Sequence, residues 1–229
     1  MATANKSGNL YLKLVPIMLS FFAMSFVDLV GTGTNFIKKD FGLSDTMAGL
    51  FPLMVFLWFL IFSVPTGLLM NRIGRRKTVL ISLVVTALAL LLPVLTIPMP
   101  HNTASFTIML VSFCLLGIGN AIMQVSLNPL LSNIVHGDRL ASALTLGQFV
   151  KAIGSFVAPI IAGWAALEFG NWKLLYPIFT GISILAVLSL GVTKIEEEDE
   201  KGEASTFRQC LALLGNGFVL LAFLGIVCH

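Results

Sequence analysis

A single carboxylate lies deep within the first long apolar stretch of this sequence. That stretch covers residues 14–37, and Asp28 falls a little beyond its middle. An ionised carboxylate at such a depth in a bilayer costs about 2.5–3.5 kcal/mol on insertion scales. Ser25, Thr32 and Asn35 share its helical face at spacings of three and four residues. The pattern favours a carboxylate that binds and releases a proton, and a buried structural Asp that never titrates is the alternative.

Amide side chains recur every four residues in the fourth apolar stretch, at Asn120, Gln124 and Asn128. An amide both donates and accepts hydrogen bonds, as the binding of a sugar or polyol hydroxyl requires. Aligned amides can also connect neighbouring membrane helices, at about 0.6 kcal/mol each. We expect these three residues to line an aqueous cavity, with interhelical contact as the alternative.

The fifth apolar stretch carries Gln148 and Lys151 on one face. Lys151 lies roughly 18 Å along a helix from Arg139, at about 1.5 Å per residue, so its side chain cannot fully reach the interface. Lys151 therefore either pairs with Asp28 or faces water and an anionic group of a substrate, and the pair itself could be purely structural. The small and cyclic residues nearby are interpreted as helix geometry that allows close packing and a bend: Gly154, Pro159 and Gly163.

The segment between the second and third stretches combines glycines with a cationic cluster. Its glycines are expected to let another helix approach closely, and Arg75 or Arg76 is expected to pair with Asp138 in a later loop. An arginine cluster alone would indicate only a cytoplasmic loop, whereas the spaced glycines make the motif more specific. The residues of this predicted gating motif, besides Asp138, are Gly67, Asn71, Arg72, Gly74, Arg75 and Arg76.

The elements that position these residues must lie in a membrane. Of 229 residues, 57% are apolar and 11% are charged, against about 25% charged in ordinary soluble domains. No Asp, Glu, Lys or Arg occurs from Thr78 to Gly137. Such a composition excludes a cytosolic enzyme and a nucleic-acid binder. The cysteines lack metal-ligand or redox spacing and the histidines form no catalytic group, so we expect no enzyme activity, metal or cofactor.

Seven stretches are long and apolar enough to cross a bilayer as helices. Most basic loop residues fall on the side of the N-terminus, which predicts a cytoplasmic N-terminus in the inner (plasma) membrane. The fold class is thus an all-α, multi-pass membrane protein. The expected spans are 14–37, 46–70, 79–97, 105–131, 140–167, 174–193 and 208–229.

The first six spans form two groups of three, which is typical of transporters built from inverted repeats. We expect a six-helix half over residues 1–193, an acidic cytoplasmic linker over 194–207, and the start of a second half over 208–229. The last span ends at Cys228-His229 without a basic anchor, which indicates an incomplete chain. The missing C-terminal half would then be a required partner.

The segment from Gly67 to Arg76 resembles the motif Gly-x-x-x-Asp-Arg-x-Gly-Arg-Arg of the major facilitator superfamily. Gly67, Arg72 and Gly74 match in place, as do both following arginines, and Asn71 replaces the acidic residue. In that family the acidic residue helps to latch the two halves together in one state. The resemblance covers the whole chain and implies transport by alternating access.

Within that superfamily the chain is similar to the fucose:proton symporter group. The similarity rests on Asp28, on the Gly117-Ile118-Gly119 segment with Gln124 and Asn128-Pro129, and on Leu146-Gly147-Gln148 with Gly154. The resemblance implies that Asp28 couples protons and that Gln148 lines a sugar site. Gln124 stands where that group has a glutamate, and Lys151 stands where it has an asparagine. These replacements leave open a sugar acid, another anion, or uncoupled transport.

The sequence therefore predicts a proton-coupled secondary transporter for a sugar or related polar solute. Its predicted substrate-binding residues are Asp28, Asn35, Asn120, Gln124, Asn128, Gln148 and Lys151. A truncated or non-transporting membrane protein, such as a receptor or the remnant of a half-transporter, is the alternative.

Overall fold

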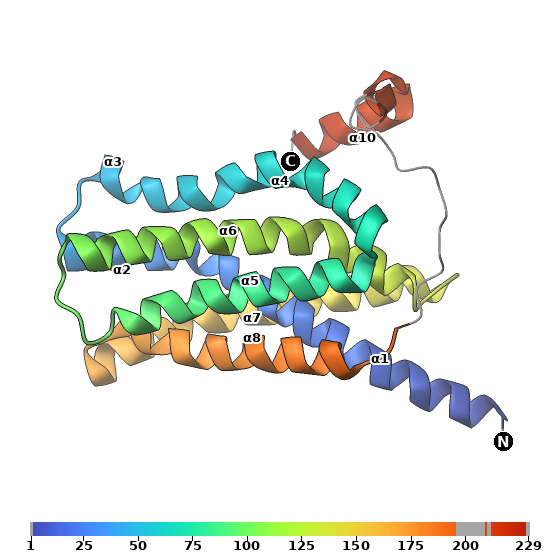
Figure 1. Ribbon diagram of the computed structural model, residues 1–229, viewed down its shortest axis with the longest axis horizontal. Helices are drawn as coiled ribbons and strands as arrows, with labels where there is room; N and C mark the ends of the chain where they lie inside the picture. The colour runs from blue at the N-terminus through green and yellow to red at the C-terminus, as the bar shows by residue number, and fades with distance from the viewer. Residues whose placement is uncertain (1, 196–208, 210–211, 228–229) are drawn as a thin grey trace.

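The computed structural model describes residues 2–195, 209 and 212–227. Six candidate membrane spans lie side by side in a bundle, with connections at both ends (Figure 1). The first six predicted spans are confirmed, and their helices begin or end a few residues before or after the predicted bounds. Their helices are α1 (Ala2–Met24), η1 (Ser25–Leu29) and α2 (Val30–Phe41) for the first span, α3 (Asp45–Ala48) and α4 (Leu50–Ile73) for the second, then α5 (Arg75–Leu95), α6 (Thr103–Ser132), α7 (Arg139–Phe169), and η2 (Trp172–Leu174) with α8 (Leu175–Val192).

The apolar pattern predicted one regular helix for the first span, and the structure differs from that prediction. A 3₁₀ segment, η1, separates α1 from α2 and contains Asp28. A 3₁₀ stretch within a long helix often marks a functional hinge or a strained sequence. The changed winding separates residues that were expected to share one face. Ser25 is buried, whereas Asp28 and Asn35 are exposed.

The helix contacts repeat with an internal symmetry. α4 packs on α6 as α7 packs on α1, and α5 packs on α6 as α8 packs on α1. α5 also packs on α8, and α1 on α6, which completes the pattern. Exchanging the first three spans with the second three thus reproduces each of these contacts, as two inverted repeats of three helices require.

Aromatic side chains and close backbone contacts hold the bundle together. Phe26 stacks on Phe179 with ring centroids 4.2 Å apart, which joins the first span to α8. Phe51 meets Phe113 edge-on at 5.1 Å between α4 and α6. At Gly117 of α6 an added Cβ would lie 2.5 Å from the backbone oxygen of Val55 in α4, so only glycine allows this helix crossing.

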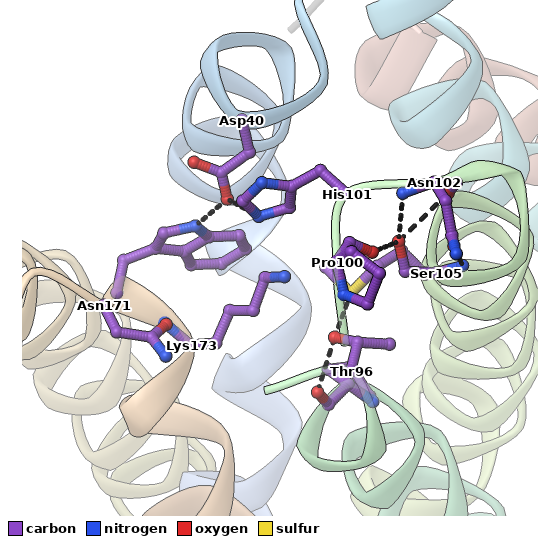
Figure 2. A network of polar contacts seen from close by, with 11 residues as sticks. Asp40, Thr96, Pro100, His101, Asn102, Ser105, Asn171 and Lys173 are labelled. Atoms are coloured by element: carbon purple, nitrogen blue, oxygen red, sulfur yellow. Dashed lines mark hydrogen bonds and ion pairs between the residues drawn. The ribbon is translucent and has the colours of Figure 1, made fainter. Parts of the chain in front are cut away.

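The end of the bundle opposite the N-terminus carries a polar network that joins three connections (Figure 2). Asp40 at the end of α2 accepts a hydrogen bond from Trp172 Nε1 at 2.8 Å. His101, from the α5–α6 loop, places Nε2 3.7 Å from the same carboxylate oxygen. Asn102 in that loop caps α6 through a reciprocal capping box with Ser105. Asp40 therefore links both three-helix repeats at the end of the bundle opposite the N-terminus.

Within the described residues, the expected seventh span is short and interrupted. It comprises the 3₁₀ turn η3 (Leu213–Gly215) and the 11-residue helix α10 (Gly217–Val227). The expected acidic linker, 194–207, lies outside the described residues from 196 onward.

Candidate functional site

Two charged residues within the spans, Asp28 and Lys151, lie next to each other. Lys151 Nζ of α7 is 3.8 Å from Asp28 Oδ2 of η1. The same oxygen accepts a hydrogen bond from Ser155 Oγ at 2.5 Å. Of the two alternatives for Lys151, the pairing with Asp28 is therefore present. The Asp28 side chain is 39% exposed and that of Lys151 is 20% exposed, so the pair remains accessible from the surface of this bundle.

Close packing between η1 and α7 sets the position of this pair. A Cβ added at Gly154 would lie 2.1 Å from Ser25 Oγ and 2.9 Å from Ser25 Cβ, so the Ser25 side chain packs directly on α7 at this glycine. Ser25 Oγ itself donates to the Phe22 carbonyl oxygen at 2.6 Å. The expectation that Gly154 allows close packing is confirmed, whereas Gly163 has no described atom within 4 Å of such a Cβ.

Ser155 is the site residue that sequence reasoning missed. It lies four residues after Lys151 on the same helix face, and its hydroxyl also reaches the Lys151 carbonyl oxygen at 3.0 Å. A hydroxyl carries one proton and can donate to only one of these two acceptors at a time. The signal in the sequence was the spacing Gln148, Lys151, Ser155, which continues the polar face of α7 by one turn.

The other predicted solute-binding residues differ in how far their side chains are buried. Asn35 and Gln148 are exposed, and Gln124 and Asn128 are partly buried. Within the described residues no hydrogen bond joins any of these four side chains to Asp28 or Lys151. The structure thus brings together Asp28 and Lys151 and leaves the amides as separate polar positions on α2, α6 and α7.

Asn120 occupies an unusual place within α6. Its side chain is buried, at 2% exposed, and both Nδ2 and Oδ1 lack a hydrogen-bond partner among the described residues. Buried polar atoms without a partner are costly, and ordered water commonly satisfies them. Gly119, the residue before Asn120, packs against Thr86 of α5. The Thr86 hydroxyl is also buried without a hydrogen-bond partner among the described residues. Asn120 therefore lies between helices and not on an open face.

The gating motif forms the tight turn from α4 to α5. Gly74 adopts φ +92°, a backbone conformation that favours glycine. Arg75 donates to Asn133 at the end of α6, and Arg76 donates to the carbonyl oxygens of Leu190 at 3.1 Å and Gly191 at 2.7 Å. Arg76 thus holds the end of α8, where unpaired carbonyl groups are available, and Arg75 holds the end of α6 through the Asn133 side chain.

The remaining motif residues differ from the expectation in two ways. A Cβ built at Gly67 would meet no atom of a neighbouring helix within 4 Å, so none of the described helices approaches closely there. Asp138 is exposed, and within the described ranges it forms no ion pair with Arg75 or Arg76. Asn71 and Arg72 are also exposed. A surface hollow beside the motif is lined by Arg72, Ile73, Lys77, Leu80 and Ile81, and it contains none of the predicted solute-binding residues.

Comparison with known proteins places this arrangement in a family of transporters. The family model described as Major Facilitator Superfamily matches residues 17–229. A glucose/galactose transporter of Brucella abortus is 29% identical over 126 residues, which cover 54% of this chain and 29% of that protein. The lysosomal dipeptide transporter MFSD1 of Bos taurus is 25% identical over 187 residues, covering 81% of this chain and 38% of that protein.

Solved structures share the fold at low sequence identity. The E. coli fucose:proton symporter FucP aligns with a TM-score of 0.68 and 16% identity, covering 88% of this chain and 55% of that chain. A structure described as showing substrate recognition in proton dependent oligopeptide transporters aligns with a TM-score of 0.67 and 16% identity. The alignment covers 97% of this chain and 48% of that chain. The chain thus spans about half the length of these solved proteins, and less of the curated relatives.

Proposed function

Because this chain belongs to the Major Facilitator Superfamily, we propose that the complete protein is a secondary active transporter that couples uptake of a small polar solute to protons. The observation that carries the proposal is the accessible Asp28–Lys151 pair between η1 and α7. Ionisable side chains inside a membrane are rare and mark substrate pathways or proton relays. A purely structural pair would be expected to bury both side chains, and Asp28 is 39% exposed.

Transport would proceed by alternating access. This six-helix half would rock against a partner half, and the face of η1 and α7 would open to each side of the membrane in turn. The partner half would supply the rest of the solute site. The Arg75 and Arg76 contacts tie the ends of α5, α6 and α8, so these helices would move as one body around the site.

Asp28 is the proposed proton carrier. When it is ionised, Lys151 and Ser155 both stabilise the same carboxylate oxygen. When it is protonated, Lys151 loses its counter-charge and becomes free to contact a solute. Proton binding and solute binding would therefore be linked through one carboxylate.

A sugar or sugar acid is the proposed solute. The glucose/galactose transporter and the fucose:proton symporter support a sugar. The amides Asn35, Gln124 and Gln148 would then hydrogen-bond the hydroxyl groups. A dipeptide is the second candidate, supported by the similarity to the dipeptide transporter MFSD1 and to oligopeptide transporters.

The bias of basic residues favours a cytoplasmic N-terminus and a location in the plasma membrane. In that orientation the Arg75–Arg76 turn faces the cytoplasm and the Asp40–His101 network faces the outside. Protons would enter from the Asp40 end of the bundle during uptake.

Uptake into proteoliposomes tests the proposal. We expect the complete gene product to take up at least one sugar, sugar acid or dipeptide faster when the vesicle interior is alkaline, and a protonophore to abolish the increase. Exchange of solute across the membrane that ignores the imposed pH gradient would contradict proton coupling. Absence of any solute movement would favour the non-transporting alternative.

A further inference from the structure

We propose that the transported solute carries a carboxylate, and that Lys151 binds this carboxylate after a proton has neutralised Asp28. This inference rests on the proposed transport function and names the class of its substrate. A sugar acid such as a hexuronate has both the hydroxyl groups that suit the amides and the anionic group that suits the lysine.

The geometry allows the Lys151 ammonium group to move from Asp28 to a solute anion. Its Nζ atom lies 3.8 Å from Asp28 Oδ2, which is too long for a hydrogen bond. Ser155 Oγ donates a hydrogen bond to the same oxygen at 2.5 Å. Ser155 thus makes the closer contact with the carboxylate, and Lys151 contributes mainly its charge. An ammonium group held at this distance can turn toward a second anion by rotation of its flexible stem. Its 20% exposure leaves a path for that anion to reach it.

The charge of the site gives the main argument. With Asp28 ionised and Lys151 protonated, the empty site is neutral. A bound proton makes it +1, and a solute carboxylate then restores neutrality. Net charge in a low-dielectric passage is costly, so the two neutral states are the ones suited to cross between the two sides. A neutral solute would leave the loaded site at +1.

The Ser155 hydroxyl keeps a hydrogen-bond partner whether Asp28 is ionised or protonated. When Asp28 is ionised, the Ser155 hydroxyl donates to Oδ2. When Asp28 takes up a proton from water on the outer side, its own hydroxyl donates to Ser155 Oγ, and Ser155 donates to the Lys151 carbonyl oxygen 3.0 Å away. Lys151 Nζ is then released from Asp28 and bonds the solute carboxylate. The proton leaves to water on the inner side after the solute does.

The test compares two sugars with their acids in proteoliposomes that contain the complete gene product. The probes are glucose, galactose, glucuronate and galacturonate. We expect the hexuronates to be taken up, to respond to an inside-alkaline pH gradient, and to ignore an inside-negative potassium diffusion potential, because one proton and one anion carry no net charge. Proton-coupled uptake of a neutral hexose would instead accelerate with that potential.

Substitution of Lys151 provides the second readout. In Lys151→Gln, hexuronate uptake is expected to fall roughly tenfold or more, because the variant lacks the positive charge that binds the solute carboxylate. Lys151→Arg keeps the charge and should retain uptake in part. Lys39→Gln, an exposed lysine on α2, is the matched control and should behave as wild type.

Hexose uptake that exceeds hexuronate uptake would overturn this inference, as would voltage-dependent hexuronate uptake, or transport of none of the four probes. Proton-driven, voltage-sensitive uptake of a hexose would leave the proposed transport function intact. Should Lys151→Gln fail to fold, the voltage response of the wild-type protein still decides the question.

Discussion

In the Asp28→Asn variant, uptake driven by a proton gradient is expected to fall to the level of protein-free vesicles. Asparagine keeps the size of aspartate and still accepts a hydrogen bond from Ser155, but it cannot bind a proton at physiological pH. Lys151 also loses its only ionic partner within the described residues. The variant should therefore still exchange labelled for unlabelled solute across the membrane while losing its response to pH. Measurement of both modes in the same preparation separates coupling from folding.

The matched control for this variant is Asp138→Asn. Asp138 is exposed at the start of α7 and forms no ion pair within the ranges that the structure describes. Its neutralisation should leave gradient-driven uptake close to the wild-type rate. Full gradient-driven uptake by Asp28→Asn would remove Asp28 from the coupling mechanism.

Replacement of Gly117 with alanine is expected to destabilise the protein strongly. The added Cβ would lie 2.5 Å from the oxygen, 2.7 Å from Cα and 3.0 Å from the carbonyl carbon of Val55. These are backbone atoms of α4, so a rotamer change cannot relieve the contact and the two helices must move apart. Overpacking of this kind typically costs about 1–3 kcal/mol, and more where the surroundings cannot relax. Thermal unfolding in detergent should show a clearly lower midpoint and less folded protein.

Gly163→Ala is the control for the intrinsic effect of the substitution. Gly163 lies within α7, and its added Cβ would meet no described atom within 4 Å. Alanine is favoured over glycine inside a helix by about 0.8–1.0 kcal/mol, so this variant should be as stable as wild type or more stable. Equal melting temperatures for the two alanine variants would contradict the close crossing of α4 and α6.

The sequence predicted the first six membrane spans well, because a span follows from composition over about 20 residues. The pairing of Asp28 with Lys151 was one of the two alternatives that the sequence left open for Lys151. Two isolated opposite charges in an apolar region favour such a pair. What the pattern could not predict was the interruption of the first span. Residues 25–29 contain neither proline nor glycine, so no local signal marks the 3₁₀ segment η1.

The contacts of the gating motif depend on tertiary structure in the same way. Arg76 binds the carbonyl oxygens of Leu190 and Gly191, which lie more than one hundred residues later in the chain. Free carbonyl groups occur at every helix end, so spacing alone cannot choose among them. Asp138 was a reasonable partner by charge, but the loop geometry places Asn133 beside Arg75 instead.

Accessibility of Gln148 to water tests the central claim most directly, because Gln148 lies on the α7 face that carries Lys151. A Gln148→Cys variant would be made in the complete protein after serine replaces every native cysteine, Cys114, Cys210 and Cys228 among them. Leu185→Cys, on an apolar exposed position of α8, is the control that should face lipid. A charged, membrane-impermeant thiol reagent should modify position 148 rapidly, with slower reaction when a transported solute is present, and should leave position 185 unmodified. Equal, slow reaction at both positions would contradict an aqueous passage along α7.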